Sequence, residues 1–169
     1  MKQQYSGANT SVNTKRIPRL FTTVTTKLDG WEPHTINMDL GCGKDPTNVN
    51  EYLHALGVYN APWDPYWNIS QDCRLLNTFG ANTATISNVL NVIKEKEARL
   101  DILRKAVHYA SGVTYIAVYE GDKSGKGKKT KEDCWQENRR TVDYVKEVEE
   151  VFTTVVYVSN LIYAFGEKR

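Results

Sequence analysis

The sequence predicts an α/β protein with a mostly parallel sheet, helices on both faces of that sheet and an antiparallel hairpin at the C-terminus. Short apolar or β-branched runs alternate along the chain with segments whose apolar residues recur at helical spacing, which is typical of a parallel sheet. Near the C-terminus, TTVVYV and LIYAF flank Ser159-Asn160, and so tight a turn makes the two strands antiparallel. The length of 169 residues suits one domain with a sizeable core.

Two strands and one helix are expected in the first part of the chain. The alternating apolar residues of 36–40 predict a strand, and the apolar residues of 49–56 recur at helical spacing and predict a helix. A second strand is expected over 58–63, where an apolar run ends at an Asp-Pro pair. Upstream, residues 15–31 have a partly helical pattern, which a cluster of threonines weakens.

The second part of the chain continues the alternation of strands and helices. After a compact segment, 84–89 is the next expected strand. Residues 94–111 predict the clearest helix, because their leucine, valine and alanine side chains share one face and charged residues surround it. The β-branched and aromatic run VTYIAVY, 113–119, predicts another strand. Thr130 and Asp133 have the spacing of a capping box, so they are expected to open a last helix.

Basic residues gather in two segments. Residues 1–30, predicted to be a basic N-terminal arm, hold five lysines and arginines against Asp29 alone, and 31–169 form the predicted main domain. Residues 122–131, DKSGKGKKTK, hold five lysines against one aspartate, although the net charge of the whole chain is only +2. The two basic segments either contact an anion or are merely solvated.

Location and metal content are predicted from features that the sequence does not have. It contains no run of about 18 apolar residues and no apolar signal-peptide core, so we expect a cytoplasmic protein that does not contact a membrane. Cys42, Cys73 and Cys134 lie far apart, and no pair has C-x-x-C spacing. Reduced thiols and the absence of a metal site are therefore expected.

The stretch INMDLGCGKD, 36–45, puts two glycines directly after the first predicted strand. Ligands of a parallel sheet bind outside the carboxyl ends of the strands, and glycines there allow a ligand to lie against bare backbone. A dinucleotide site would carry G-x-G-x-x-G, but Pro46 stands at the third glycine position, and the G-K-[ST] of a P-loop is missing. A ligand with a nucleoside and no pyrophosphate therefore fits best.

The segment MDLGCGKD resembles the first motif of class I S-adenosylmethionine-dependent methyltransferases, in which a hydrophobic strand ends in acid-x-Gly-x-Gly. The resemblance covers about residues 34–165 and implies a Rossmann-like sheet, here reduced around its third strand. It implies that Asp39 holds the amino-acid part of the cofactor, directly or through water. Gly41, Cys42 and Gly43 would provide the backbone that lies close to the cofactor.

The second motif of that family is an acid at the end of the second strand, and Asp64 occupies this place. Asp64 follows Gly43 by about 20 residues, the usual separation for a ribose-binding acid in such a sheet, and a carboxylate can accept from two neighbouring hydroxyls. Taken alone, Asp64-Pro65 would rather indicate a turn. The resemblance implies that Pro65, Tyr66 and Trp67 form a wall of the cofactor site, with an aromatic ring beside the adenine.

The stretch TISNVLNVI, 85–93, resembles the segment that ends the fourth strand of the family. Ser87, Asn88 and Val89 would face the cofactor and the methyl group to be transferred. Asn88 is the candidate catalytic residue, because its amide oxygen could accept a hydrogen bond from an acceptor amine. Asp72 is the only acid nearby in the sequence for a contact with the adenine amine.

Together these features predict an S-adenosylmethionine-dependent methyltransferase whose acceptor is not determined, with nucleic acid as the first acceptor to test. The small size and the basic arm suit a phage protein or another mobile-element protein, and a phage-encoded protein would act in the host cytoplasm. Besides the basic arm, the residues predicted to contact nucleic acid are Lys123, Lys126, Lys128, Lys129, Lys131, Arg139 and Arg140.

Two other functions stay open. A non-catalytic protein could bind S-adenosylmethionine or its demethylated product S-adenosylhomocysteine and act by sequestration or by contact with a partner. A nicotinamide-dependent oxidoreductase on a similar fold is disfavoured by Pro46. The lysine-rich segment could cover the acceptor pocket, hold a polynucleotide or be a disordered surface loop.

Overall fold

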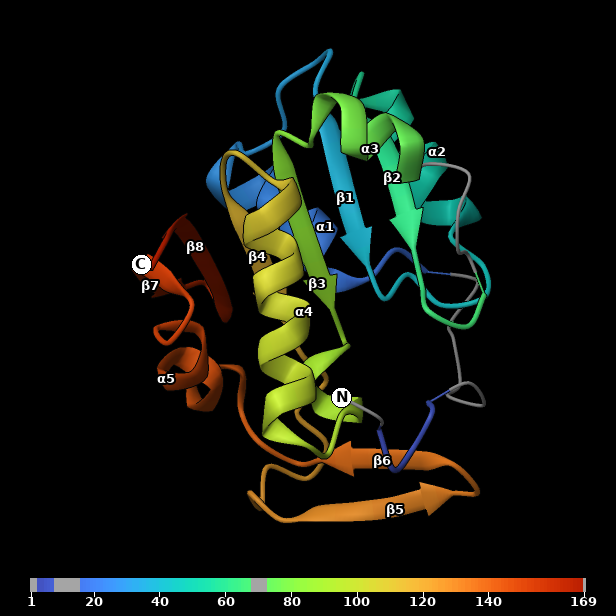
Figure 1. Ribbon diagram of the computed structural model, residues 1–169, viewed down its shortest axis with the longest axis vertical. Coiled ribbons are helices and arrows are strands. Elements are labelled where there is room, and N and C mark those ends of the chain that lie inside the picture. The colour runs from blue at the N-terminus through green and yellow to red at the C-terminus, as the bar shows by residue number, and fades with distance from the viewer. Residues whose placement is uncertain (1–2, 8–15, 68–72, 169) are drawn as a thin grey trace.

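The computed structural model describes residues 3–7, 16–67 and 73–168. Its strands form a six-stranded sheet in the order β2-β1-β3-β4-β8-β7 and a separate two-stranded sheet, β5-β6 (Figure 1). The strands of the large sheet are β1 (Ile36–Leu40), β2 (Tyr59–Trp63), β3 (Thr83–Ser87), β4 (Thr114–Ala117), β7 (Phe152–Val158) and β8 (Leu161–Glu167).

The large sheet is mostly parallel. β1 pairs in parallel with β2 and β3, and β3 pairs in parallel with β4, whereas β8 runs antiparallel to both β4 and β7. Ser159 and Asn160 make the β7–β8 turn with φ angles of 52° and 60°, as in the two-residue turns that close hairpins. The prediction of an α/β protein with a mostly parallel sheet and a C-terminal antiparallel hairpin is confirmed.

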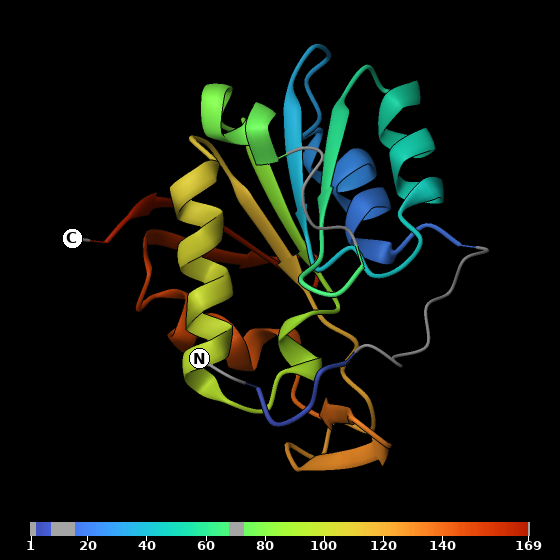
Figure 2. The same cartoon turned by 45° about the vertical axis from the view of Figure 1, so that its right-hand side comes forward.

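Helices cover both faces of the large sheet (Figure 2). The helices on one face are α3 (Cys73–Phe79), α4 (Lys96–Tyr109) and α5 (Val145–Val148). The helices on the other face are α1 (Arg19–Thr23), the π-helical turn η1 (Val24–Leu28) and α2 (Thr47–Ala55). Two 3₁₀ turns are η2 (Leu90–Val92) and η3 (Thr141–Tyr144).

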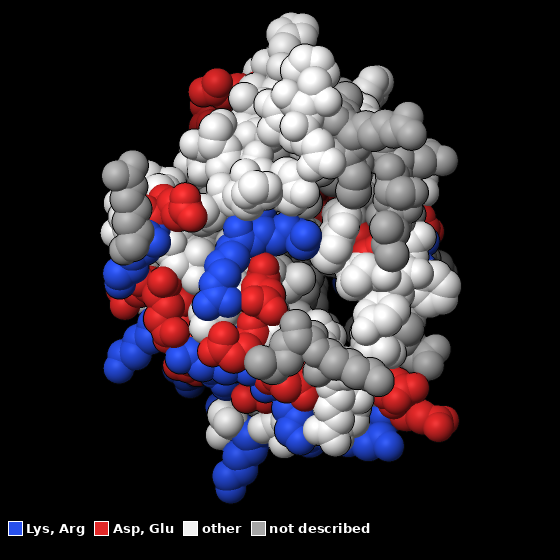
Figure 3. All heavy atoms as spheres, viewed as in Figure 1, with Lys and Arg blue, Asp and Glu red and all other residues white. Residues whose placement is uncertain are grey.

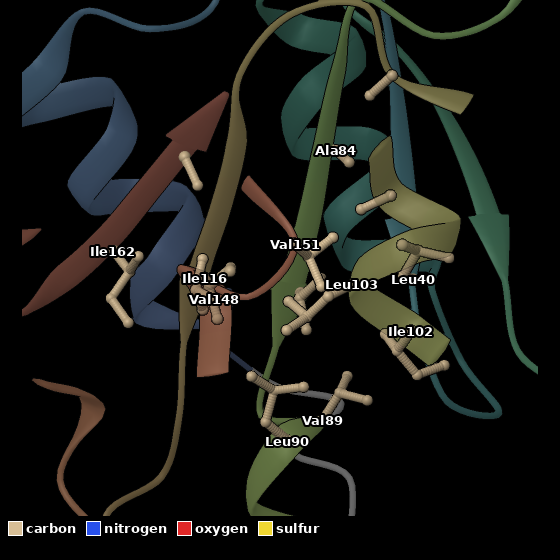
Figure 4. Packing of buried hydrophobic residues seen from close by; sticks show 14 of the residues in the cluster. Leu40, Ala84, Val89, Leu90, Ile102, Leu103, Ile116, Val148, Val151 and Ile162 are labelled. Carbon is tan, nitrogen blue, oxygen red and sulfur yellow. The ribbon is translucent and has the colours of Figure 1, made fainter. Parts of the chain in front are cut away.

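An apolar core fills the space between the sheet and α4 (Figure 4). Leu103 of α4, Ile86 of β3 and Ile116 of β4 are completely buried, because the apolar stripe of α4 faces the sheet. Burying a side chain of this size stabilises the fold by about 1.5–3 kcal/mol. Leu40, the last residue of β1, belongs to the same core, so the chain passes directly from the core into the glycine loop.

A second apolar core lies on the opposite face of the sheet. Leu20, Phe21 and Val24 are buried in it, and the ring of Trp31 lies 5.6 Å from the ring of Tyr115. Part of the segment predicted to be a basic arm thus contributes apolar side chains to the core of the domain. Residues 8–15 of that segment lie outside the described residues.

The prediction that a helix begins at Thr130 is wrong. Its residues belong to a hairpin, in which β5 (Gly127–Lys131) pairs with β6 (Cys134–Glu137). Asp133 has a φ of 58° in the turn, a conformation that aspartate tolerates better than most residues. Side chains of β6 alternate between buried and half-buried positions, which is the period of a strand. Helical structure follows only in η3 and α5.

The described residues between β2 and β3 form one regular element, α3, and no strand. The candidate Asp72 belongs to 68–72, which lie outside the described residues. In the described part of the chain, no helix combines the length and the apolar character needed to cross a membrane. Nor do three His, Cys, Asp or Glu side chains gather there as a metal ion would require.

Candidate functional site

A cavity of about 400 Å³, here called the first cavity, opens at the carboxyl ends of β1, β2 and β3. The chain pairs β2 on one side of β1 and then β3 on its other side, so the cavity lies where the strand order reverses, the usual place for a ligand in an open α/β sheet. Its volume is that of a small-molecule site. The sequence-predicted residues on its wall are Gly41, Cys42, Gly43, Asp64, Pro65, Tyr66, Trp67, Ser87, Asn88 and Val89.

The loop after β1 presents bare backbone to the first cavity. Gly41 and Gly43 have φ angles of 76° and 73°, which glycine adopts without strain. A Cβ atom added to Gly41 would lie 2.4 Å from Cγ2 of Val89. Glycine at position 41 is therefore required by the backbone conformation and also by the close approach of Val89 from the end of β3.

Asp64 connects the two loops that flank the first cavity. Its Oδ2 accepts a hydrogen bond from the N–H of Gly43 (3.1 Å), and its Oδ1 accepts from the N–H groups of Tyr66 (2.9 Å) and Trp67 (3.3 Å). Asp64 thus stabilises the turn that Asp-Pro indicates and at the same time contacts the glycine loop. A carboxylate offers about four lone-pair positions, so capacity remains for a ligand hydroxyl.

The rim of the first cavity is aromatic. Tyr66 and Trp67 line the cavity, and about half of the surface of each residue is exposed to solvent (49 % and 51 %). Cys42 lies on the opposite loop and donates its N–H to the carbonyl of Trp63 (3.2 Å). This rim can hold a planar ligand through stacking with an aromatic face.

The loop after β3 forms the other side of the first cavity. Asn88 is exposed and has a φ of 59°, and its N–H donates to the carbonyl of Ala117 (2.9 Å). Asparagine is one of the few residues that enter this left-handed region, and residues held there are concentrated at functional sites. Ser87 precedes Asn88 on the wall, and the buried Val89 packs against Gly41.

Among the predicted cofactor-site residues that the structure describes, Asp39 is the one that does not line the first cavity. It is 3 % exposed, and its Oδ1 accepts a hydrogen bond from Oγ1 of Thr85 in β3 (3.0 Å). Burial raises the pKa of Asp39 to about 6, although hydrogen bonds from Thr85 and Asn60 partly oppose this effect. Asp39 lies behind the glycine loop, where it joins β1 to β3.

We expect the Asp39→Asn substitution to change the pH dependence of stability. Because burial favours the protonated carboxyl, Asp39 stabilises the fold fully below its unfolded pKa near 4, and this contribution is lost as the pH rises through about 6. The asparagine keeps an oxygen for Thr85 but does not ionise. Relative to the variant, the unfolding free energy of the wild type should fall by about 3 kcal/mol between about pH 4 and pH 7.5, as measured by urea unfolding. A constant difference over this range would contradict the expectation.

A second cavity of about 360 Å³ adjoins the first. It lies at the carboxyl ends of β3 and β4, beside the β7–β8 turn, and Arg19, Ser87 and Asn88 line both cavities. Tyr119 and Glu120, which follow β4, are on the wall of the second cavity. Two ligands bound in these cavities would therefore meet at Ser87 and Asn88.

The sequence did not identify Tyr119 or Glu120 as site residues, and it predicted Arg19 only as part of the basic arm. Tyr119 is the last residue of the predicted strand 113–119, so the rule that ligands bind at the carboxyl ends of strands was a usable signal for it. Arg19 had no such signal, because it precedes the first strand and reaches the cavities only through the packing of α1 on the sheet.

Charged groups of both signs line the second cavity. Oε1 of Glu120 accepts a hydrogen bond from the N–H of Thr141 (2.8 Å), and Nζ of Lys123 lies 3.5 Å from its Oε2. Burial alone would raise the pKa of Glu120, but the hydrogen bond from Thr141 and the charge of Lys123 lower it. The cavity thus combines a fixed carboxylate with the cations of Arg19 and Lys123.

The basic residues predicted to contact nucleic acid differ in their surroundings. Arg139 is turned inward, where its guanidinium lies 2.6 Å from Oε1 of Glu147, and Lys128 pairs with Asp122 at 3.1 Å. Figure 3 shows basic and acidic side chains mixed at the lower end of the molecule, where Figure 1 has the β5–β6 hairpin. The exposed residues of the set are Lys123, Lys126, Lys128, Lys129, Lys131 and Arg140.

No protein-family model matches the chain, and no curated protein is significantly similar to it. The function is therefore inferred from the two cavities. The inference depends mainly on three features: the bare backbone of the glycine loop, the Asp64 carboxylate bound to it, and the boundary that Ser87 and Asn88 form between the cavities.

Proposed function

We propose that the protein binds S-adenosylmethionine in the first cavity and transfers its methyl group to an acceptor in the second cavity. The observation that carries this proposal is the hydrogen bond between the Asp64 carboxylate and the N–H of Gly43 where the strand order reverses. This bond holds a carboxylate suited to ribose hydroxyls directly beside backbone that a ligand can approach closely. The resemblance of MDLGCGKD to the methyltransferase motif supports the same ligand.

An adenosine without phosphates fits this site better than a dinucleotide. The helix after the glycine loop, α2, has Pro46 at its N-cap, and proline has no N–H to offer a phosphate. Oδ1 of Asp45 accepts a hydrogen bond from the N–H of Thr47 (3.2 Å), and hydrogen bonds with Thr47 lower the pKa of Asp45. A carboxylate thus already occupies the start of α2, which disfavours a phosphate at the place where dinucleotide sites hold one.

Each residue around the first cavity has a separate role in the proposal. Asp64 would accept from the ribose hydroxyls with its remaining lone-pair capacity, and the ring of Tyr66 or Trp67 would flank the adenine. The backbone of 41–43 would lie against the methionine part of the ligand. Asp39 would support that loop from behind through Thr85, with any contact to the ligand made through water.

The boundary between the two cavities is the proposed place of transfer. When bound, S-adenosylmethionine supplies an activated methyl group, so positioning of the acceptor provides much of the catalysis. Asn88 would accept a hydrogen bond from the acceptor amine or hydroxyl and orient its lone pair toward the first cavity. A nucleic acid is the first acceptor to test, since Arg19 and Lys123 bring positive charge to the second cavity and β5 carries exposed lysines.

Calorimetry with S-adenosylhomocysteine and NAD⁺ tests the ligand class. We expect S-adenosylhomocysteine to bind and NAD⁺ not to bind, because the start of α2 disfavours a pyrophosphate. The Asp64→Ala variant should bind S-adenosylhomocysteine at least about 10-fold more weakly, since it loses a charged acceptor for a hydroxyl. Tight binding of NAD⁺, or unchanged affinity in Asp64→Ala, would overturn the proposed cofactor site.

Transfer of a tritiated methyl group to DNA, RNA and cell extract tests the reaction itself. The best variant is Asn88→Gly, because glycine removes the amide but accepts the φ of 59° at this position. We expect at least about a 10-fold loss of labelling in Asn88→Gly, with unchanged affinity for S-adenosylhomocysteine. If the wild type labels no acceptor while it binds the cofactor, the protein is the non-catalytic binder that the sequence left open.

A further inference from the structure

Residues Gln3–Gly7, here called the N-terminal strap, run beside β6 (Figures 1 and 2, dark blue trace). Gln3, Ser6 and Gly7 line that cavity together with the glycine loop and Asp64. The strap belongs to no helix or strand, so side-chain contacts and single backbone hydrogen bonds hold it in place.

At its centre, the strap contacts two residues from other parts of the chain through the ring of Tyr5. The ring of Tyr5 stacks on the ring of Trp135 in β6, with centroids 5.4 Å apart and planes inclined by 23°. Nζ of Lys94 lies 5.7 Å from the Tyr5 ring and 5.0 Å from the Trp135 ring, a distance at which a cation is attracted by aromatic faces. The same Nζ donates a hydrogen bond to Oε1 of Gln4 (2.7 Å).

Two backbone hydrogen bonds fix the strap on either side of this stack. The N–H of Gln4 donates to Oε1 of Glu95 (3.1 Å), and the N–H of Gly7 donates to the carbonyl of Asp133 in the β5–β6 turn (3.0 Å). The strap therefore bridges the segment before α4 and the β5–β6 hairpin. With Gln3, Ser6 and Gly7 on its wall, the strap encloses part of the first cavity from the side of these elements.

The contacts of the strap are strong enough to hold it in place most of the time and weak enough to let it open. Each is a single stack, cation contact or hydrogen bond at the surface, and segments held by few buried contacts open locally. Oε2 of Glu95 is buried without a hydrogen-bond partner among the described residues. A buried carboxylate oxygen without a partner is unfavourable, so the strap is held by a group that would gain from contact with water.

We propose that the N-terminal strap is a lid on the first cavity, and that the Tyr5–Lys94–Trp135 stack holds it closed. A ligand in the first cavity then leaves only when the strap lifts. The identity of the ligand used below rests on the proposed function, but the closure of the strap does not. In this proposal the β5–β6 hairpin is the docking surface for the strap, which it contacts through Trp135 and Asp133.

The rate at which S-adenosylhomocysteine leaves the full-length protein tests the lid. In Tyr5→Ala we expect this rate to rise at least about 10-fold, because the stack is lost, whereas Tyr5→Phe keeps the ring and should match the wild type. Trp135→Phe, which keeps a smaller aromatic face, should fall between them. Equal release rates in Tyr5→Ala and wild type would overturn the lid.

Amide hydrogen exchange of the ligand-free protein separates this proposal from the cofactor proposal. The N–H groups of Gln4 and Gly7 should exchange at least about 10-fold faster in Tyr5→Ala than in wild type and Tyr5→Phe. If S-adenosylhomocysteine fails to bind at all while this exchange pattern holds, the proposed function is wrong and the strap still closes the cavity. If Gln4 and Gly7 exchange equally fast in all three proteins, the strap is not held by Tyr5, whatever ligand binds.

Discussion

Replacing Glu147 by glutamine is expected to lower the free energy of unfolding by about 3–5 kcal/mol. The carboxylate of Glu147 lies 2.7 Å from Nε of Arg99 and 2.6 Å from the guanidinium of Arg139. The side chains of Arg99 and Glu147 are only 6 % and 9 % exposed. A glutamine would leave two guanidinium groups without the carboxylate that both of them contact, in a poorly solvated site. Breaking a buried pair in this way costs much more than the pair contributes against an apolar replacement.

The chain contains a matched control for this substitution. Lys96 at the start of α4 and Glu150 in the turn after α5 form an ion pair at 2.7 Å, but their side chains are 49 % and 44 % exposed. The Glu150→Gln substitution should therefore cost no more than about 1 kcal/mol. Urea unfolding of both variants near neutral pH makes the comparison. Equal losses of stability would show that the buried network contributes no more than a surface pair.

The same network should give an acid-dependent loss of stability. Burial alone would raise the pKa of Glu147, but hydrogen bonds from Arg99 and Arg139 outweigh burial and lower it. The stabilisation is therefore present at neutral pH and lost as the pH falls through the lowered pKa of Glu147. In Glu147→Gln this loss should be absent.

Arg99 connects the buried network to the site. Its NH1 donates to the carbonyls of Ile93 and Lys94, both at 2.8 Å. Ile93 lines the first cavity, and Lys94 holds the N-terminal strap. Glu147 thus fixes, through Arg99, the backbone from which one wall of the cavity and the closure of the strap are built.

Much of the candidate site was predictable because its parts follow strands. In a parallel sheet the carboxyl ends of the strands meet at one edge, so the residues after 36–40, 58–63 and 84–89 had to lie close together. The 3.1 Å hydrogen bond between Gly43 and Asp64 agrees with this expectation. Apolar periodicity was sufficient to locate these strands, since each one is buried in a core.

The parts that could not be predicted depend on contacts between distant residues or on a single backbone angle. Gln4 and Glu95 are 91 positions apart, and the polar segment around Gln4 has no periodicity that would reveal its partner. The β5–β6 hairpin was mistaken for the start of a helix because Thr-x-x-Asp suits a capping box as well as a turn. The left-handed conformation of Asp133 decides between them, and no apolar pattern in the sequence reports it.

Replacing Gly41 by alanine is the second substitution with a large expected effect. Two penalties add at this position: an L-residue is strained at a φ of 76°, and its Cβ would lie 2.4 Å from Cγ2 of Val89. We expect a loss of about 2–5 kcal/mol in the free energy of unfolding, from backbone strain together with overpacking. Affinity for S-adenosylhomocysteine should fall at least about 100-fold, because the added methyl group and any shift of the loop away from Val89 change the backbone surface on the wall of the first cavity.

Two further variants separate the penalties at Gly41. Gly125 has a φ of 72° and open space around the position of an added Cβ, so Gly125→Ala reports the cost of backbone strain alone, about 1–2 kcal/mol. Val89→Ala removes the methyl groups that would lie 2.4 and 3.1 Å from the new Cβ. In the double variant Gly41→Ala/Val89→Ala we expect a favourable coupling of about 1–3 kcal/mol.

Urea unfolding of the single and double variants, with calorimetry on each, shows which requirement matters for the ligand. If Gly41→Ala costs no more than Gly125→Ala, Val89 moves aside and only the left-handed backbone requires glycine at position 41. If the double variant regains stability but not affinity, the ligand itself needs the space of the missing side chain. That second result would support close approach of a ligand to the glycine loop, because the two methyl groups nearest to the new Cβ would be gone and only Cβ of residue 89, at 3.3 Å, would remain.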